Sequence, residues 1–321
     1  MRDMPSQVLV ADVGGTNARL ALAGPDGALS AITRYPNEAY GSFYEVLHRF
    51  ATDRVRGRVG AITIAVAGPV TSDRARLTNR DWTFEREALS RALPEQDRVP
   101  VRLVNDLAAL GHSLPALGGD QVRLMRPATG AGPSNGQALV VGIGTGFNVC
   151  LAKSSPEGSM VIEAELGHSS LPASVVAAVE AAIGKAALGF PTTEDLFSGR
   201  GLVQFYRALS GGRESPAHEI VDAAADGDAL ARQTVEHVVR YLSLLTRQLV
   251  FQYLPLDGIY FAGSVARGLF GGNREEAFLE SLPSDGPFEH LIAQVPLRVI
   301  ADDAAALFGL TRLARPLAEA G

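Results

Sequence analysis

Two glycine-rich segments carry the residue types that bind a phosphate and its metal ion. They lie about half a chain apart and read Asp12-Val13-Gly14-Gly15-Thr16-Asn17 and Gly142-Ile143-Gly144-Thr145-Gly146. Glycines let backbone N–H groups approach an anion, a threonine adds a hydroxyl, and the Asp12 carboxylate suits a hydrated Mg²⁺. Two such turns facing each other would grip the phosphates of one nucleotide from both sides. The alternative for either segment is an ordinary glycine turn without a ligand.

No Walker signature accompanies these turns. The only lysines are Lys153 and Lys185, and neither belongs to a G-x-x-x-x-G-K-S/T sequence. Backbone dipoles, Mg²⁺ and arginine would therefore have to stabilise the negative charge of a bound phosphate.

A carboxylate at the end of a strand is the candidate general base. The pair Asn105-Asp106 follows the apolar run 99–105 and stands at the predicted start of a helix. There Asp106 can accept the proton of an attacking hydroxyl while Asn105 holds a neighbouring hydroxyl. The alternative is a helix N-cap, a role that Asn and Asp commonly take at such a place.

Residues suited to sugar hydroxyls come later in the chain. Glu165, His168 and Glu194 combine carboxylates with a ring that donates or accepts a hydrogen bond. The alternatives are a hydrogen-bonded core histidine and a first-turn helix acid. A glycosidase also uses two carboxylates, but it would leave the phosphate turns unexplained. Gly263 opens a small-residue turn against which an adenine and its ribose could lie, or a plain strand-to-helix turn.

The hydrophobic pattern predicts the sheets that position these residues, and it predicts the same arrangement twice. Apolar runs at 7–12 and 18–23 form a hairpin that 137–143 and 147–153 repeat. Further strands are expected near 29–35, 60–67, 99–105, 258–262 and 296–301. Helices are expected at 42–53, 84–93, 172–188, 193–210, 217–254 with a break near Gly227, 274–281 and 302–317. The fold class is therefore α/β with mixed sheets.

Composition excludes several classes of protein. The 321 residues, 46% of them hydrophobic, are enough for two domains with full cores. A net charge of −6 without a basic cluster argues against nucleic-acid binding. The single cysteine, Cys150, forms no internal disulfide, and the apolar stretches are shorter than a membrane span. No leader opens the chain, so we expect a soluble cytoplasmic protein with no membrane partner.

Taken in order, these motifs resemble the bacterial glucokinase family, in the group without the repressor-type zinc motif, within the actin-like ATPase/sugar kinase superfamily. The matching segments are ADVGGTNARLAL (11–22), AVAGPV (65–70), LTNRDW (77–82), VNDLAA (104–109), GTG (144–146), ELGH (165–168) and EDLFSGRGL (194–202). The resemblance implies two ribonuclease-H-like domains around a central cleft. We expect residues 1–112 with 302–321 in a small domain and 113–301 in a large one.

The resemblance also implies an activity and a role for each candidate residue. The expected reaction transfers the γ-phosphoryl of Mg-ATP to a hexose, most simply glucose giving glucose 6-phosphate. Asp106 would be the base, and Asn105, Glu165, His168 and Glu194 would contact the sugar. The residues expected at the nucleotide are Asp12, Gly14, Gly15, Thr16, Asn17, Gly144, Thr145, Gly146 and Gly263, with Asp12 near Mg²⁺. We expect a homodimer.

Three positions depart from the family pattern. Asn148 and Ser264 stand where the family usually has Gly, and Leu166 stands where small residues surround the sugar-binding Glu. Asn tolerates a left-handed backbone, so Asn148 is compatible with the turn. Leu166 would narrow or reshape the sugar pocket, which keeps open a kinase for another hexose or an amino sugar. Asn148 and Ser264 keep open a non-catalytic sugar sensor.

Overall fold

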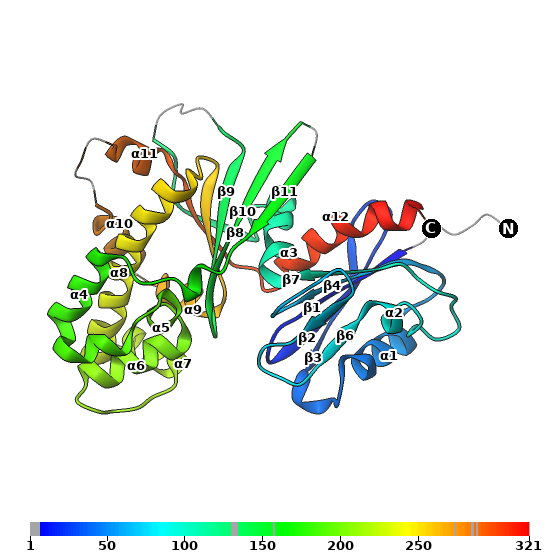
Figure 1. The fold of residues 1–321 in the computed structure, drawn as a ribbon, viewed down its shortest axis with the longest axis horizontal. Helices are drawn as coiled ribbons and strands as arrows, with labels where there is room; N and C mark the ends of the chain where they lie inside the picture. Colours follow the sequence, from blue (N-terminus) through cyan, green and yellow to red (C-terminus); the bar gives the residue numbers. More distant parts are fainter. Residues whose placement is uncertain are drawn as a thin grey trace. The chain divides into compact units, whose positions relative to one another are not determined.

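The chain divides into two compact units, which are described one at a time. The structure is a computed structural model that describes residues 7–129, 134–156, 158–272, 274–283, 286 and 288–320. Unit 1 comprises Met1–Gly118 and Asp303–Gly321, and unit 2 comprises Gly119–Asp302 (Figure 1). No helix among these described residues is both long and apolar enough to cross a membrane.

Unit 1 is built on a five-stranded mixed sheet. Its strands are β1 (Gln7–Val13), β2 (Asn17–Ala23), β3 (Leu29–Pro36), β4 (Val59–Val66) and β7 (Val101–Asn105), in the spatial order β3-β2-β1-β4-β7. The first three strands pair antiparallel, β4 is parallel to β1, and β7 is parallel to β4. The carboxyl ends of β1, β4 and β7 therefore lie at one edge of the sheet.

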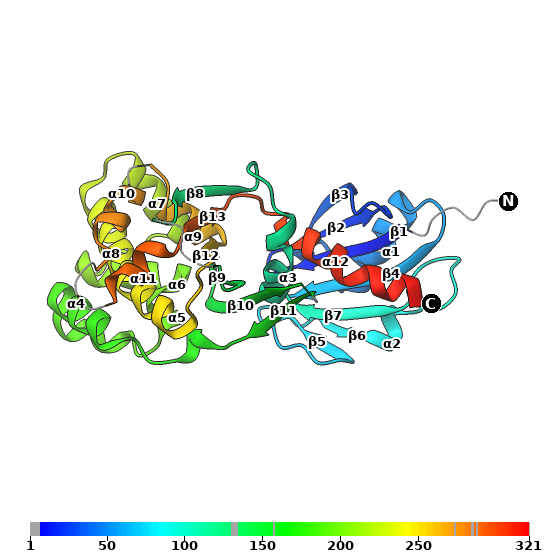
Figure 2. The ribbon, with the colours of Figure 1, turned by 90° about the horizontal axis from the view of Figure 1, so that it is seen from above.

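Both faces of this sheet are covered because β1 is apolar on both. One face, with Leu9, packs against the buried side of α1 (Phe43–Arg54). The other face, with Val10, packs against α3 (Asp106–Ser113) and α12 (Ala305–Ala320), and α12 runs along β1 and β4 (Figure 2). A Cβ at Gly309 would collide with the carbonyl oxygen of Ala109, so glycine there permits the close approach of α12 to α3.

Short elements complete unit 1. They are η1 (Asn37–Ala39), β5 (Arg74–Arg76), β6 (Thr83–Glu85), α2 (Arg86–Leu89) and η2 (Leu114–Ala116). The prediction of a helix over 84–93 is wrong except for the single turn of α2. Residues 83–85 instead pair with β5, and their alternation, with Phe84 buried between two exposed residues, is that of a strand.

Unit 2 repeats the sheet of unit 1 with one strand added. Its strands are β8 (Val122–Arg126), β9 (Gln137–Ile143), β10 (Phe147–Ser155), β11 (Gly158–Glu163), β12 (Gly258–Ala262) and β13 (Leu297–Ile300), in the order β11-β10-β9-β12-β13-β8. The strands β9, β10 and β11 pair antiparallel, and β12 and β13 continue parallel to β9, as β4 and β7 continue from β1. The predicted mixed α/β fold with a repeated hairpin is confirmed.

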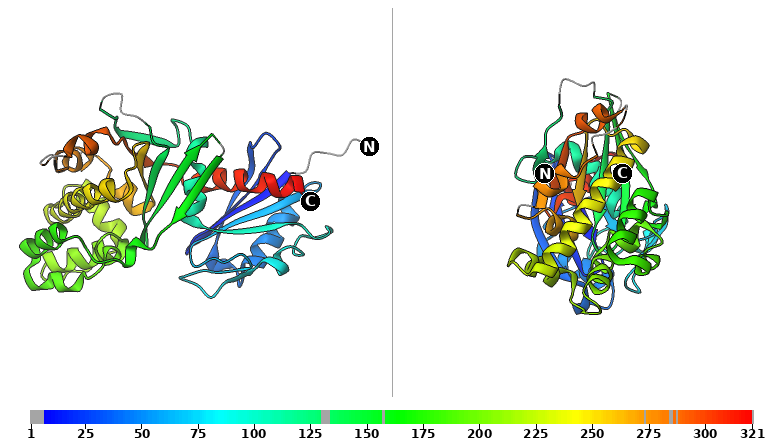
Figure 3. Two further views of the ribbon diagram at one scale, coloured as in Figure 1. Left: turned by 45° about the horizontal axis from the view of Figure 1, so that its top comes forward. Right: turned by 90° about the vertical axis from the view of Figure 1, so that its left-hand side faces the viewer.

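The helices of unit 2 gather on one side of its sheet (Figure 3). They are η3 (Leu166–His168), α4 (Ala173–Ile183), η4 (Gly184–Gly189), α5 (Thr193–Leu196), α6 (Gly199–Leu209), α7 (Ala217–Ala225), α8 (Ala229–Tyr253), α9 (Ser264–Leu269), α10 (Arg274–Glu280) and α11 (Glu289–Gln294). Phe205 and Leu242 of this layer join Val141 and Phe261 of the sheet in one core.

Two helix predictions in unit 2 have different outcomes. The predicted break near Gly227 is confirmed: Gly227 has φ +95°, and the Asp228 side chain caps α8 by accepting from the N–H of Ala231. The prediction of one helix over 193–210 is wrong, because the chain leaves the helix at Phe197 and the Ser198 hydroxyl caps a new helix, α6.

Candidate active site

The predicted site residues of unit 1 meet at the carboxyl edge of its sheet. The Gly14–Asn17 turn follows β1, Ala67 and Gly68 follow β4, and Asn105-Asp106 ends β7 and begins α3. Hydrogen bonds join these three segments: the N–H of Ala67 donates to the oxygen of Val13 at 3.0 Å, and Asn105 Nδ2 donates to the oxygen of Gly68 at 3.4 Å. The turn and the candidate base therefore share one edge of unit 1.

The Gly14–Asn17 turn leaves its tip open. The N–H of Gly14 donates to the oxygen of Asn17 at 3.0 Å, and Thr16 at the tip is exposed. A Cβ at Gly14 would make only an ordinary contact, 3.6 Å from the Asn17 oxygen. Packing therefore does not require glycine at position 14. The close approach of a ligand to the backbone would explain why glycine stands there.

Asp12, beside this turn, has a strongly shifted pKa. Its side chain is 13% exposed, and Arg19 on the neighbouring strand lies 3.5 Å away while also pairing with Asp303 at 3.3 Å. Burial raises the pKa of Asp12 to about 6, although Arg19 lowers it. Because ionisation of a buried carboxylate costs free energy, a cation bound nearby would stabilise the ionised form of Asp12.

The ligands available at Asp12 suit Mg²⁺ only if water molecules and substrate phosphates complete its coordination. No group of three or more His, Cys, Asp or Glu side chains in the described part of the chain could hold a metal ion by itself. Mg²⁺ typically keeps several waters and binds through one or two carboxylates and substrate phosphates. A single partly buried Asp12 is compatible with that mode, with phosphates supplying the other contacts.

Asn105 has the capping role that the sequence left open, and Asp106 stands in the first turn of the helix. Asn105 Oδ1 accepts from the N–H groups of Leu107 and Ala108, at 3.0 and 3.3 Å, and so caps α3. Asp106 Oδ1 accepts from the N–H of Leu107 at 2.9 Å. The Asp106 carboxylate is half-buried and is held at the N-terminus of α3. A carboxylate held in one orientation suits the role of a general base.

In unit 2 the second turn stands at the equivalent edge. The N–H of Gly144 donates to the oxygen of Gly146 at 2.9 Å, Thr145 is exposed, and a Cβ at Gly144 would meet nothing within 4 Å. Gly263 follows β12 with φ +98°, and a Cβ there would lie 2.4 Å from the Ile143 oxygen. Gly263 is therefore required by the fold, whereas Gly144 is not.

Glu194 lies against this second turn. Its Oε2 accepts from the N–H of Phe147 at 3.0 Å, and its Oε1 pairs with Arg200 at 2.6 Å. A Cβ at Gly146 would collide with the Glu194 carboxylate, and one at Gly167 would collide with the Phe147 oxygen. Glu194 also stands in the first turn of α5, so the helix-acid interpretation and a site role are compatible.

Glu165 is held by a residue that the sequence analysis interpreted differently. Asn148 Nδ2 donates to Glu165 Oε2, and Asn148 Oδ1 accepts from the N–H of Leu166, both at 3.0 Å. Asn148 lies within β10 with a negative φ, so its tolerance of a left-handed backbone is not used. Its departure from the family pattern was the available signal, but the contact depends on the register between distant segments.

His168 is exposed in η3, so the interpretation of this residue as a core histidine is wrong. The N–H of His168 donates to the oxygen of Glu165 at 3.2 Å, which keeps the two residues in one tight turn. Unit 2 therefore brings Glu165, His168, Glu194 and the 144–146 turn into one hydrogen-bonded region.

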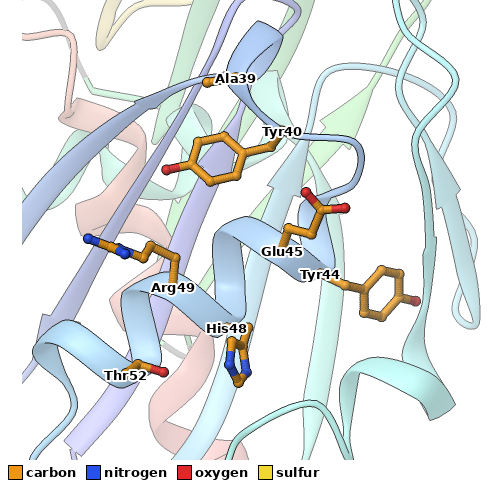
Figure 4. A pocket seen from close by; sticks show the side chains of 7 residues that line it. All are labelled: Ala39, Tyr40, Tyr44, Glu45, His48, Arg49 and Thr52. Atoms are coloured by element: carbon orange, nitrogen blue, oxygen red, sulfur yellow. The ribbon is translucent and has the colours of Figure 1, made fainter.

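A groove elsewhere on unit 1 contains none of the predicted site residues. It lies on the exposed side of α1 and is lined by Tyr40, Tyr44, Glu45, His48 and Arg49, with Ala39 and Thr52 (Figure 4). Figure 4 shows the Tyr40 and Tyr44 rings on different sides of the groove rather than stacked, so they form no common platform. Hydrophobic and ionic contacts within unit 1 already engage Tyr40 with Tyr35 and Arg49 with Asp53.

Comparison with known proteins identifies the family. The sequence profile of the Glucokinase family matches residues 9–317. The chain belongs to the glucokinase family. It is 30% identical to the glucokinase of Tolumonas auensis, over 95% of this chain and 96% of that protein. The chain spans about half the length of the first curated relatives it matches, which are bifunctional proteins from Paraburkholderia and Burkholderia.

Solved structures share the fold of this glucokinase-family chain. A glucokinase from an Antarctic psychrotroph matches with a TM-score of 0.82 and 24% identity, over 97% of this chain and 99% of that one. A glucokinase of the ROK family from Streptomyces griseus, solved with glucose and AMPPNP, matches with a TM-score of 0.64 and 19% identity, over 97% and 100%. The predicted actin-like ATPase fold of sugar kinases is confirmed.

Proposed function

We propose that this chain is an ATP-dependent hexose kinase that phosphorylates glucose at the 6-hydroxyl. Family membership supports the reaction class, and the relatives named glucokinase support the sugar. The observation that carries the proposal is the duplicated edge: equivalent sheets each end in an open Gly-Thr turn, with Asp106 beside the first turn and Glu165, His168 and Glu194 beside the second.

The proposed role of Asp106 is to take the proton of the attacking hydroxyl. The N–H of Leu107 holds its carboxylate at the start of α3, where it would orient and deprotonate a sugar hydroxyl. Asn105 uses Oδ1 for the helix cap and Nδ2 for Gly68, which fixes the side chain beside the base. The carboxylates of Glu165 and Glu194 and the exposed ring of His168 would accept or donate to the remaining hydroxyls.

The two turns are proposed to hold the nucleotide. Backbone N–H groups at 14–17 and 144–146 would donate hydrogen bonds to phosphate oxygens, with Thr16 and Thr145 adding hydroxyls. Gly263 lets its own backbone pack closely against the start of the second turn. Asp12 would hold a water-coordinated Mg²⁺. When bound with ATP, Mg²⁺ neutralises the charge that develops on the transferred phosphoryl group.

A coupled assay with purified protein tests the function. We expect ADP release that depends on both ATP and glucose, and a product identified as glucose 6-phosphate by NMR. Comparison of kcat/KM for glucose, mannose, fructose and N-acetylmannosamine decides the sugar, and a clear preference for another of these would replace glucose. Sugar binding by calorimetry without ATP consumption would instead establish the non-catalytic sensor.

We also propose that the protein acts as a homodimer in the cytoplasm, as the sequence led us to expect. The end of α8 and the residue after it offer apolar surface, because Phe251 and Leu254 are each 37% exposed. Light scattering coupled to gel filtration measures the mass in solution. A mass of one chain at micromolar concentration would reject the dimer.

A further inference from the structure

Asn37 is a fully buried polar residue that touches the first glycine turn from behind. It begins η1, directly after β3, and has no exposed surface. Its Nδ2 donates to the oxygens of Gly14 and Gly15, at 2.8 and 3.2 Å, and its own N–H donates to the oxygen of Thr16 at 2.9 Å. One residue therefore binds three successive carbonyl groups of the turn.

These contacts fix the direction of the N–H groups as well as the carbonyls. A planar trans peptide carries its C=O and the next residue's N–H on opposite sides. When the oxygens of Gly14, Gly15 and Thr16 point at Asn37, the N–H groups of residues 15–17 point away from it. The N–H of Gly14 is used within the turn, by the oxygen of Asn17.

The burial of Asn37 has a cost that packing does not explain. Among the described residues its Oδ1 has no hydrogen-bond partner, and an unsatisfied buried acceptor is destabilising. The amide cannot relieve this by rotating, because the same two carbonyls would then face Oδ1 instead of the donor Nδ2. A leucine of similar size would avoid the cost if the position served packing alone.

We propose that Asn37 is a positioning residue for the nucleotide. Its hydrogen bonds hold the peptide planes of the 14–17 turn so that the N–H groups of Gly15, Thr16 and Asn17 are presented to phosphate oxygens before ATP binds. The inference rests on the proposed function. It assigns the preorganisation of this turn to a residue that lies outside it in the sequence and touches no ligand.

Binding of AMPPNP with Mg²⁺ to Asn37→Leu and Asn37→Ser tests the proposal. Asn37→Leu removes both Nδ2 donors, and Asn37→Ser retains a single, shorter donor. We expect the Kd for AMPPNP, measured by calorimetry, to rise about tenfold or more in Asn37→Leu and less in Asn37→Ser, with the Kd for glucose unchanged. In the kinase assay the KM for ATP should rise with it.

The matched control is Thr311→Val in α12 of the same unit. Thr311 is also buried, and its hydroxyl donates to the Leu307 oxygen at 3.0 Å, far in sequence from the turn. This variant should lower thermal stability and leave the Kd for AMPPNP unchanged. If Asn37→Leu lowers stability but binds AMPPNP as the wild type does, Asn37 has only a structural role and the proposal is overturned.

Hydrogen exchange on the unaltered protein keeps the test decisive if Asn37→Leu does not fold. Residues 15–17 should exchange more slowly on addition of AMPPNP and Mg²⁺, and the free turn should show one backbone conformation by NMR. Several interconverting turn conformations without nucleotide would contradict preorganisation. A wild-type protein that binds no AMPPNP overturns the proposed function together with this inference, whereas normal binding by folded Asn37 variants overturns this inference alone.

Discussion

Asn148 Nδ2 lies 3.0 Å from Glu165 Oε2, and the same side chain accepts the N–H of Leu166 at the same distance. A residue on β10 thus sets the position of a carboxylate proposed to contact the sugar. It also sets the start of the turn that carries His168. Glycine, which the resemblance led us to expect at position 148, could make neither contact.

Asn148→Gly should weaken sugar binding. A net hydrogen bond contributes about 1 kcal/mol, so loss of the Asn148 contacts should raise the KM for the hexose roughly five- to tenfold. The KM for ATP should not change. Steady-state kinetics with either substrate varied measures this, and Ser155→Ala at the far end of β10 is the control. An unchanged hexose KM would show that Glu165 is positioned without Asn148.

Gly144→Ala and Gly263→Ala should separate ligand binding from folding. A Cβ at position 144 meets nothing within 4 Å, so Gly144→Ala should keep its Tm while the KM for ATP rises severalfold. Gly263 has φ +98° and no room for a Cβ, so Gly263→Ala should lower the Tm by several degrees. A Gly144→Ala protein with wild-type ATP kinetics would exclude the 144–146 turn from the nucleotide site.

Asp12→Asn should stabilise the metal-free protein at neutral pH. The pKa of Asp12 is raised to about 6 from 3.8, so the folded state binds its proton more tightly than the unfolded state does. Stability is therefore lost as pH rises from about 4 to about 6, by roughly 3 kcal/mol at most. In EDTA, Asp12→Asn should raise the Tm at pH 7 and not at pH 4. An equal shift at both pH values would contradict the raised pKa.

The hairpins, the parallel strands and the duplicated turns could be predicted from the sequence, because strands buried in a core appear as runs of apolar residues. β11 could not, since its Met160 and Ile162 are exposed and the strand has no buried side to create a pattern. Among the site residues, the position of Asn105-Asp106 at the end of a strand could be predicted. The contacts of Asn37 and Asn148 were not, because each joins segments whose register is set by tertiary pairing.

The most direct measurement of the central claim is the kcat of Asp106→Asn with glucose and ATP. The variant keeps the size of the side chain and removes the proton acceptor, so kcat should fall by about 10²- to 10⁴-fold while the Kd for glucose changes little. The exposed Asp97→Asn serves as control and should be unaffected. A folded Asp106→Asn protein that keeps a near-normal kcat would contradict the assignment of Asp106 as the base.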